Sequence, residues 1–467
     1  MLNEVNLKLI VAVCTVNVLN FATGNVYAWS SSVLIALKKT DPKENPLGHI
    51  VTPLEESLIA SILSLGAICG PMFAGFCSNL LGRKTTLMLF AIPMLLSNVI
   101  LMFATTTLEL YVARFMAGFA SGSFYTVVPI YVGEIAETKI RGVLGGFMSI
   151  FYVFGLLFNY VVGPCVSLPT LSAFMIVPIV IFLIFFGLFI PESPYYYFAK
   201  GKDAHARRSL MKLRNHFEEK ELAIIEETIN ESRTNVTLSS LLRNASFKKG
   251  LTLTATIVIL QQLVGITAIL AYMEDIFIAS GSTISSSTST IVVAIIQVIS
   301  VVFSTCLSDK LGRKILLVIS NLLCAAALFP LGVYFWLKQN ENDVSHLGYL
   351  PIACVILFIT GYNFGLCTIP WTLVGELFSN ETKAIASSAT ATSCYIMAFS
   401  MSFLFPHLLN WVGFHGVFWF CGCMGIVNLT FVAWYLPETK GKSFSEILKL
   451  LEGEKLNKET YETVRVL

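Results

Sequence analysis

The residues of this chain that could do chemistry are polar side chains set inside long apolar segments. The clearest set lies in residues 261–275, QQLVGITAILAYMED, within a run that is otherwise apolar. On a continuous helix, Gln261, Gly265 and Ala268 share one face, and Gln262 lies beside it. A buried amide without a partner costs about 2–7 kcal/mol in an apolar medium. We therefore expect the two amides to meet a neighbouring helix, water or a bound molecule.

Sequence patterns typical of catalysis and metal binding are not found. The chain shows no Ser/His/Asp or Cys/His set, no phosphate-binding loop and no HExxH, and its 6 His are scattered. Nearly all of the 11 Cys lie in apolar segments, which favours packing thiols over a disulfide framework. Cys421 and Cys423 form a CxC that has no neighbouring metal ligands. We expect no enzyme, no cofactor and no metal ion.

Composition identifies the elements that must position the glutamines. The chain has 467 residues, of which 55% are hydrophobic and 13% are charged. Soluble domains carry about 25% charged residues, and a spanning helix needs about 20 mostly apolar ones. The predicted fold class is therefore an all-α membrane protein. Twelve segments qualify as transmembrane helices: 8–37, 55–78, 86–105, 110–133, 142–164, 171–190, 251–278, 288–308, 315–337, 348–374, 384–410 and 416–436.

Basic residues are distributed unevenly between the two sets of loops. The N-terminus, the loops after even-numbered segments and the C-terminal tail hold 26 Lys or Arg, and the other loops hold four. By the positive-inside rule, the richer face, here called the inner face, is cytoplasmic, and so are both termini. The sequons in loops then lie inside and should carry no glycan: Asn230, Asn235, Asn244 and Asn380.

Two further features concern the N-terminus and the overall charge. The first apolar run is too long for a signal peptide, so we expect it to be the first spanning helix. The net charge of +2 implies no nucleic-acid partner.

Carboxylates are missing from the centres of the predicted spanning segments. Those nearby lie towards the outer ends (Glu55, Glu56, Glu109, Glu274, Asp275) or the inner ends (Glu134, Glu376). A carboxylate inside the membrane is the usual carrier of a proton or cation. Its absence argues against coupling to an ion gradient.

The two halves of the chain repeat. Four landmarks recur in the same order: Leu81–Lys84 with Leu311–Lys314, Gly118 and Gly122 with Gly361 and Gly365, Glu134 and Arg141 with Glu376 and Lys383, and Pro191–Ser193 with Pro437–Thr439. Such a repeat predicts two pseudo-symmetric six-helix halves. We expect an N-terminal half at 1–190, a cytoplasmic linker at 191–250, a C-terminal half at 251–436 and a cytoplasmic tail at 437–467.

The linker and the tail each allow two interpretations. Segments 203–216 and 218–232 have helical character, which is typical of short amphipathic linker helices. The alternative is a lipid-headgroup contact through Arg207, Arg208, Lys212 and Arg214. In the tail, residues 446–451, EILKLL, fit either an amphipathic helix or an acidic dileucine sorting pattern.

The motifs together are similar to those of a known family. They read RFMAGFASG at 114–122, YVGEIAETKIRG at 131–142, PESPYYYFAKGK at 191–202, QQLVGITAILAY at 261–272, SDKLGRK at 308–314, IPWTLVGELF at 369–378 and PETKGKS at 437–443. In combination they resemble the sugar porters of the major facilitator superfamily, especially insect trehalose and hexose facilitators and animal glucose facilitators. The resemblance covers essentially the whole chain. It implies a twelve-helix alternating-access carrier with a substrate site near the midplane.

The resemblance also implies which residues contact the sugar. These are Gln261, Gln262, Thr267, Gln297, Asn363 and Trp371. Amides and an aromatic face suit a neutral polyol. The alternative for the glutamines is hydrogen bonding between helices, and for Trp371 it is ordinary packing, with Pro370 breaking the helix beside it. Thr267 replaces a family Asn, and Asn363 stands where glucose facilitators carry Glu.

By the same resemblance, charged residues form an inner latch that pairs when the inner end closes. The predicted latch residues are Arg83, Glu134, Arg141, Glu192, Arg313, Glu376, Lys383 and Glu438. The alternative is that the basic residues only mark the inner face. Asn79, Leu80 and Tyr195 depart from the family pattern and weaken this latch.

The function implied is facilitative transport (uniport) of a hexose or trehalose. Ser30 stands where proton-coupled members carry Asp, consistent with uncoupled transport. Two alternatives stay open: a sugar sensor or transport-poor relative, and a proton-coupled sugar symporter. The expected partners are a sugar and the lipid bilayer, in a multi-pass protein of the plasma membrane. The sequence assigns no oligomeric state.

Overall fold

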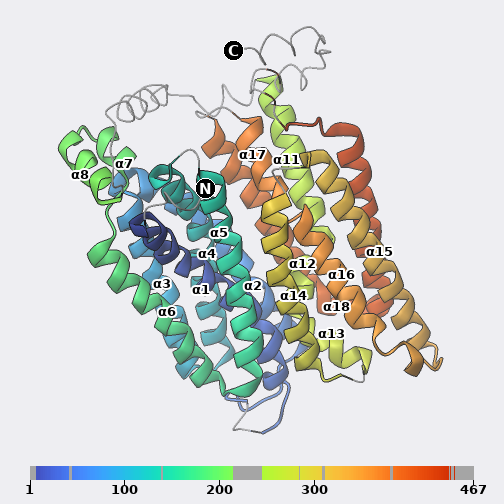
Figure 1. Cartoon of the computed structure of the whole chain (residues 1–467). Coiled ribbons are helices and arrows are strands. Elements are labelled where there is room, and N and C mark those ends of the chain that lie inside the picture. The colour runs from blue at the N-terminus through green and yellow to red at the C-terminus, as the bar shows by residue number, and fades with distance from the viewer. Residues whose placement is uncertain are drawn as a thin grey trace.

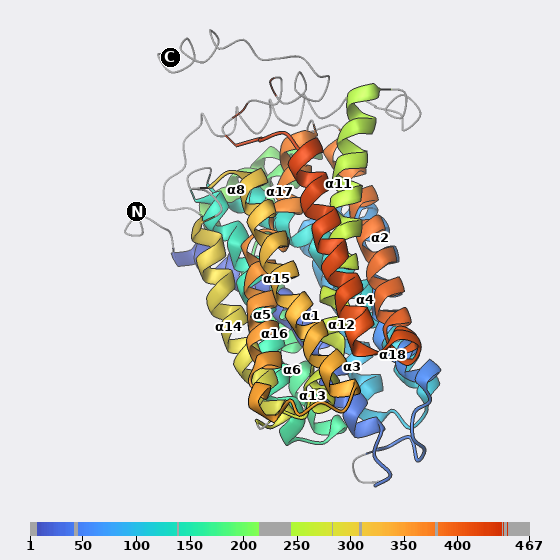
Figure 2. The ribbon, with the colours of Figure 1, turned by 90° about the vertical axis from the view of Figure 1, so that its right-hand side faces the viewer.

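The computed structural model describes residues 7–41, 45–137, 140–213, 244–282, 284–307, 311–378, 382–440, 442 and 446. These residues form helices and connecting turns, arranged as two groups of long helices that stand side by side (Figure 1, Figure 2). The first group is α1 (Leu7–Leu37), α2 (Pro53–Leu81), α3 (Arg83–Phe103), α4 (Thr107–Ile135), α5 (Arg141–Val162) and α6 (Leu168–Phe189). Two short helices follow it, α7 (Pro194–Ala199) and α8 (Asp203–Leu213).

The second group contains shorter and interrupted elements. It comprises α11 (Ala245–Leu263), α12 (Ile266–Ala271), α13 (Met273–Ser280), α14 (Ser286–Leu307), α15 (Arg313–Gln339), α16 (Leu350–Phe364), α17 (Ile369–Leu377) and α18 (Lys383–Tyr435). Single 3₁₀ turns lie at Gly163–Cys165 and Ser345–Leu347.

The number of membrane crossings agrees with the predicted twelve. Among the described residues, 11 helices are long and apolar enough to span a membrane. The last of these, Ile385–Tyr435, has 51 residues, whereas one crossing needs about 20. Within it, Gly413 has φ 70° and ψ 173°, which separates two helical runs. The prediction of an all-α, twelve-helix membrane protein is therefore confirmed.

At the outer end, helices α2 and α4 begin at capping motifs that are present in the sequence. Thr52 caps α2 and Thr106 caps α4, and in each capping box the glutamate three residues later, Glu55 or Glu109, returns a bond to the cap. The outer carboxylates of these two helices therefore satisfy the free N–H groups of a helix start.

Glycines let neighbouring helices approach closely within each half. A Cβ at Gly118 of α4 would lie 1.8 Å from the Leu63 carbonyl oxygen of α2. Its repeat partner, Gly361 of α16, instead faces Leu323 of α15, where a Cβ would lie 2.6 Å from the leucine Cβ. The GxxxG landmark thus recurs in sequence, but it packs against different helices in the two halves.

The prediction of one continuous helix over 251–278 is wrong. The helix begins earlier, at Ala245, because the Asn244 side chain accepts hydrogen bonds from the first N–H groups. It then breaks at Gly265, whose φ of 95° lies in the left-handed region that favours glycine. Short helices α12 and α13 continue beyond the break, with a second interruption at Tyr272.

Two other predicted helices also differ from the structure. Segment 348–374 is interrupted between Phe364 and Ile369, so Pro370 does not create the break itself but lies in the first turn of α17, where a missing N–H costs little. The predicted linker helix 203–216 is observed as α8, Asp203–Leu213. The predicted segment 218–232 and nearly all of the tail lie outside the described residues.

Replacing the glycine at the break should destabilise the protein. Gly265→Ala should lower the free energy of unfolding by about 1–2 kcal/mol, because a left-handed backbone disfavours a Cβ. The new Cβ would also lie 2.9 Å from the Cys421 sulfur. The thermal midpoint of the detergent-solubilised protein measures the effect. Gly133→Ala is the control, since nothing lies within 4 Å of its Cβ position. Equal midpoints for the two variants would contradict this interpretation.

Candidate functional site

The two adjacent glutamines lie at the end of α11, just before the helix break. Gln261 Nε2 donates to the Tyr362 hydroxyl at 2.7 Å and to the Leu366 carbonyl at 2.7 Å. Gln262 Nε2 donates to the Cys394 sulfur at 3.2 Å, and its Oε1 accepts from the Thr267 hydroxyl. The structure therefore gives the two glutamines adjoining sets of hydrogen bonds, here together called the glutamine network, which extend from α11 and α12 to α16 and α18.

The two glutamines differ in whether their amide atoms all have hydrogen-bond partners. Both ends of the Gln262 amide have partners, whereas the buried Oε1 of Gln261 has none. The same holds for the buried Oε1 of Gln297 and the buried Nδ2 of Asn363. Unpaired polar atoms of this kind are costly in an apolar interior, which indicates that they meet water or a polar ligand.

The remaining predicted contact residues are less closely joined to this network. Gln297 lies on α14 and Asn363 on α16, and both side chains are buried. Ser304 of α14 donates to the Asn363 carbonyl at 2.6 Å, which joins these two helices. Trp371 lies on α17 and is 37% exposed, and its role as a sugar contact stays a prediction.

Sequence analysis missed a group of tyrosines between the two halves. Tyr152 of α5 packs edge-on against Tyr27 of α1 and Tyr125 of α4, with ring centroids 6.0 and 6.1 Å apart. Tyr125 lies close enough to Tyr395 of α18 to interact electrostatically, and Tyr152 lies similarly close to Tyr362. These tyrosines bring aromatic faces and hydroxyls to the glutamine network from the opposite half. Their shared position follows only from helix packing, so no spacing in the sequence reveals it.

An ion-pair bridge joins the two halves at the outer end. Lys38 Nζ lies 2.8 Å from Glu56 Oε1 of α2 and 2.9 Å from Asp275 Oδ1 of α13. Burial lowers the pKa of Lys38, but attraction to Asp275 and Glu56 outweighs it and raises that pKa above 10.5. Because the folded-state pKa is raised, the contribution of the Lys38 charge is fully present below the ordinary lysine pKa and is lost as pH rises past the raised value.

Uncharged contacts close the same end. The Glu274 N–H donates to the Ser31 hydroxyl at 3.1 Å, and the Tyr160 hydroxyl donates to the Leu270 carbonyl at 3.0 Å. In each pair one residue lies in the first half and the other on α12 or α13. The broken segment after Gly265 is therefore fastened against the first half.

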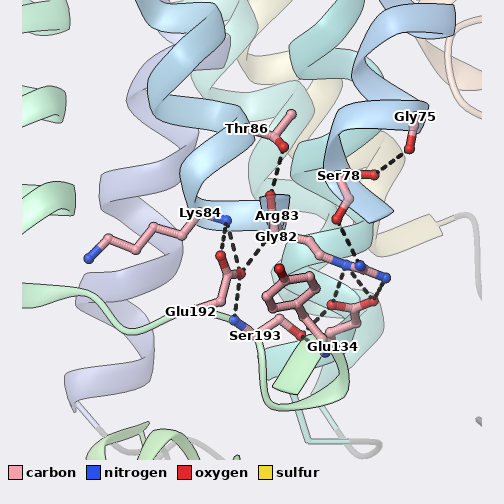
Figure 3. Close-up of polar contacts among 10 residues, drawn as sticks. Gly75, Ser78, Gly82, Arg83, Lys84, Thr86, Glu134, Glu192 and Ser193 are labelled. Atoms are coloured by element: carbon pink, nitrogen blue, oxygen red, sulfur yellow. Dashed lines mark hydrogen bonds and ion pairs between the residues drawn. The ribbon is translucent and has the colours of Figure 1, made fainter. Parts of the chain in front are cut away.

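At the inner end, the first half contains a compact charge cluster (Figure 3). Arg83 holds the Glu134 carboxylate with two of its nitrogens, at 2.8 and 3.0 Å, and Ser193 also donates to it. Glu192 accepts from the N–H groups of Arg83 and Lys84 at the start of α3, each at 2.9 Å. A carboxylate at a helix start is favoured by free N–H groups and by the helix dipole.

The second half repeats this cluster with equivalent residues. Arg313 holds Glu376 at 3.0 Å, Thr439 donates to Glu376, and Glu438 accepts from the Arg313 N–H at 2.9 Å. The glycine before each arginine leaves room for a glutamate carboxylate. A Cβ at Gly82 would lie 2.3 Å from a carboxylate oxygen of Glu192, and a Cβ at Gly312 would lie 2.3 Å from one of Glu438.

The inner ion pairs lie within one half each. Arg83 pairs with Glu134 and Arg313 with Glu376, so among the described residues these pairs do not join the halves. Lys383 lies close enough to Glu376 for electrostatic attraction, and the Arg141 side chain lies outside the described residues. The role of these residues as an inner latch stays a prediction.

Removing the central charge of the outer bridge should loosen the outer end. Lys38→Ala leaves the Glu56 and Asp275 carboxylates facing each other, so α12 and α13 should lose about 1 kcal/mol of local stability. Hydrogen exchange of residues 266–280 measures this change. Lys38→Arg keeps the positive charge and should exchange like the unmodified protein. Unchanged exchange in Lys38→Ala would show that the bridge does not hold these helices.

Neutralising a helix-start carboxylate should release the segment attached to it. Glu192→Gln weakens the bonds to the start of α3 and should cost α7 and α8 about 1–2 kcal/mol of local stability. Faster hydrogen exchange over residues 194–213 is the expected result. Glu438→Gln, at the equivalent position of the second half, should leave 194–213 unchanged. The interpretation fails if both variants exchange alike there.

Comparison with known proteins places this architecture in a family. A family model described as "Sugar (and other) transporter" matches residues 10–451. The chain is 31% identical over 452 residues to the facilitated trehalose transporter Tret1 of Culex quinquefasciatus, covering 95% of this chain and 86% of that protein. It is 30% identical over 452 residues to Tret1 of Drosophila virilis, covering 95% of this chain and 49% of that protein. The chain thus spans about half the length of several Drosophila relatives.

Solved structures share the fold. The proton:xylose symporter XylE bound to 6-bromo-6-deoxy-D-glucose superposes with a TM-score of 0.77 at 22% identity, covering 95% of this chain and 99% of that one. An inward-open form of XylE from E. coli gives a TM-score of 0.76 at 22% identity over the same shares. Because the family model covers nearly the whole chain and the twelve-helix arrangement agrees with it, this chain belongs to the Sugar (and other) transporter family.

Proposed function

We propose that this protein moves a sugar, a hexose or trehalose, across a membrane by facilitated uniport with alternating access. The observation that carries the proposal is the buried glutamine network facing tyrosines of the opposite half. Gln261, Gln297 and Asn363 each retain an unpaired buried polar atom, and sugar hydroxyls can both donate to and accept from such atoms. The facilitated trehalose transporters among its relatives support the same substrate class.

The charged groups inside the described spanning helices favour uniport over proton coupling. Arg114 is 1% exposed, and its guanidinium donates to the carbonyls of Ile59 and Val26 at 3.1 and 2.5 Å. It also lies over the Trp29 ring, 5.1 Å from the centroid. These partners are carbonyls and an indole, which do not release protons in the physiological range. Ser30 likewise offers a hydroxyl where a proton carrier would need a carboxylate.

The proposed cycle alternates between closure of the two ends. In the present state, Lys38 and its carboxylate partners fasten the outer end, and the partly exposed Trp371 lies on α17, which stands towards the inner end in Figure 1. Sugar would bind to Gln261 and its neighbours from the inner side, with Trp371 against its ring. The halves would then rock, breaking the outer bridge while the inner clusters approach each other.

We further propose a plasma-membrane location with both termini cytoplasmic. The inner loops carry most of the Lys and Arg residues, which favours retention of that face in the cytoplasm. In this orientation α7 and α8 lie on the cytoplasmic side of the first half (Figure 1).

Transport in a defined membrane tests the function. The purified chain would be reconstituted in liposomes, and labelled glucose and trehalose would be followed with and without a pH gradient. We expect counterflow of at least one sugar that the gradient does not enhance. Accumulation driven by the gradient would instead establish symport. Ligand-induced melting shifts without flux would establish a sensor, and neither binding nor flux by folded protein would reject the proposal.

Substitutions at the network should weaken sugar handling without unfolding the protein. Gln261→Ala removes one amide contact and should lower sugar affinity about three- to tenfold. Trp371→Leu removes the aromatic face and should also lower affinity or flux. Gln339→Ala, at the outer end of α15, is the control for amide loss. Normal transport by both site variants, at normal abundance, would place the pocket elsewhere.

A further inference from the structure

A cavity lies at the inner end of the first half, away from the glutamine network. It has a volume of about 550 Å³, is partly open, and is lined by the ends of α3 and α6 and by α7 and α8. Figure 1 shows α7 and α8 beside these helix ends at the edge of the bundle, on the side of the first half that is away from the second half. The proposed transport cycle makes no use of it.

The cavity wall is strongly basic. Lys84, Arg208 and Lys212 contribute three positive charges, and His205 adds an imidazole. The single carboxylate in the wall, Glu192, is engaged by backbone N–H groups at the start of α3. The surplus of positive charge therefore selects an anion.

Two of these cations are available for a ligand. Arg208 and Lys212 are exposed on α8, and among the described residues no carboxylate pairs with either of them. Lys84 Nζ donates to the carbonyls of Gly187 and Ile190, both at 2.7 Å, which uses two of its three donors. A phosphate group can accept from all three side chains.

Helix α8, which carries Arg208 and Lys212, packs against the rest of the first half through its apolar face. α8 buries Ala206, Ser209 and Leu210 and exposes the basic face, as expected for an amphipathic helix. Ser209 donates to the Glu192 carbonyl, and the Tyr197 ring packs on His205 with centroids 5.5 Å apart. These contacts hold α8 in place, so its basic side chains form part of the cavity wall.

The cavity lies at the inner end of a spanning helix, where lipid headgroups are expected. The spanning helix α6 ends at Phe189, directly at the cavity wall. The rim residues Leu188 and Phe189 are 74% and 65% exposed, so an apolar surface adjoins the basic cavity. A ligand whose charged head fills the cavity could extend an apolar tail along this rim.

We propose that this cavity binds the phosphate-monoester headgroup of an anionic lipid. The headgroup lies among Lys84, Arg208 and Lys212, and the acyl chains lie against Leu188 and Phe189 of α6. A soluble phosphate ester shares the headgroup chemistry but has no use for the apolar rim. This inference does not depend on the proposed transport function.

Native mass spectrometry of the purified full chain tests the site with dioleoyl phosphatidic acid as the probe. The double variant Arg208→Gln/Lys212→Gln should bind this lipid at least about tenfold more weakly than the unmodified protein. The control, Lys202→Gln/Arg207→Gln, loses the same charge from residues outside the cavity wall and should bind like the unmodified protein. Equal melting temperatures establish that all variants are folded.

Three outcomes would count against the proposal. Equal loss of binding in both double variants would show a general charge effect and overturn the site. Binding of dioleoyl phosphatidylcholine as tight as that of phosphatidic acid would overturn the headgroup assignment. Competition by glycerol 3-phosphate at concentrations equal to those of the lipid would keep the phosphate site but overturn the lipid as its source.

Discussion

The structure depends on one constraint: a polar group inside the bilayer must find its partner within the protein or in a bound molecule. The charged side chains obey it by gathering at helix ends, where carboxylates meet free N–H groups, as Glu192 does at α3 and Glu438 at α15. Arg114, which lies deeper, is satisfied by backbone carbonyls and an indole. Several buried amides and hydroxyls in the described residues keep an unpaired polar atom, among them Gln261, Gln297 and Asn363. What distinguishes Gln261 as a candidate contact is that its amide adjoins the tyrosines of the opposite half.

The two halves share the same charge cluster at the inner end, but their first helices differ near the midplane. Each half builds its arginine–glutamate pair around a glycine that admits a second carboxylate. The first half, however, keeps α1 as a continuous helix, whereas its counterpart in the second half breaks at Gly265. The break frees short segments that carry Leu270, Glu274 and Asp275 to the first half. Asymmetry between the halves thus arises where closure of the outer end is needed.

Much of the fold could be predicted because it follows from local patterns. Segment length and hydropathy identify the spanning helices. The recurrence of the same landmarks in both halves anticipates that the arginine–glutamate pairs occur twice, although the spacing noted was that of Glu134 with Arg141 and the observed pair is Arg83 with Glu134. The breaks in the second half were missed because Gly265 interrupts a run that stays apolar on both sides, so hydropathy does not change there. The tyrosines and the bridge at Lys38 were missed for another reason. Their partners are more than a hundred residues away in sequence or on other helices, and only packing brings them together.

Ion pairs join the two halves at the outer end but lie within each half at the inner end. This difference affects the free energy of opening each end. At the outer end, Lys38 is shared between Glu56 of its own half and Asp275 of the other, so opening that end separates opposite charges. At the inner end the described ion pairs are complete within each half, so separation of the halves leaves them intact. The present state therefore keeps every one of these charges paired. A state open to the outside must give Asp275 a new partner or expose it to water, and the free energy of that exchange contributes to the balance between the two states.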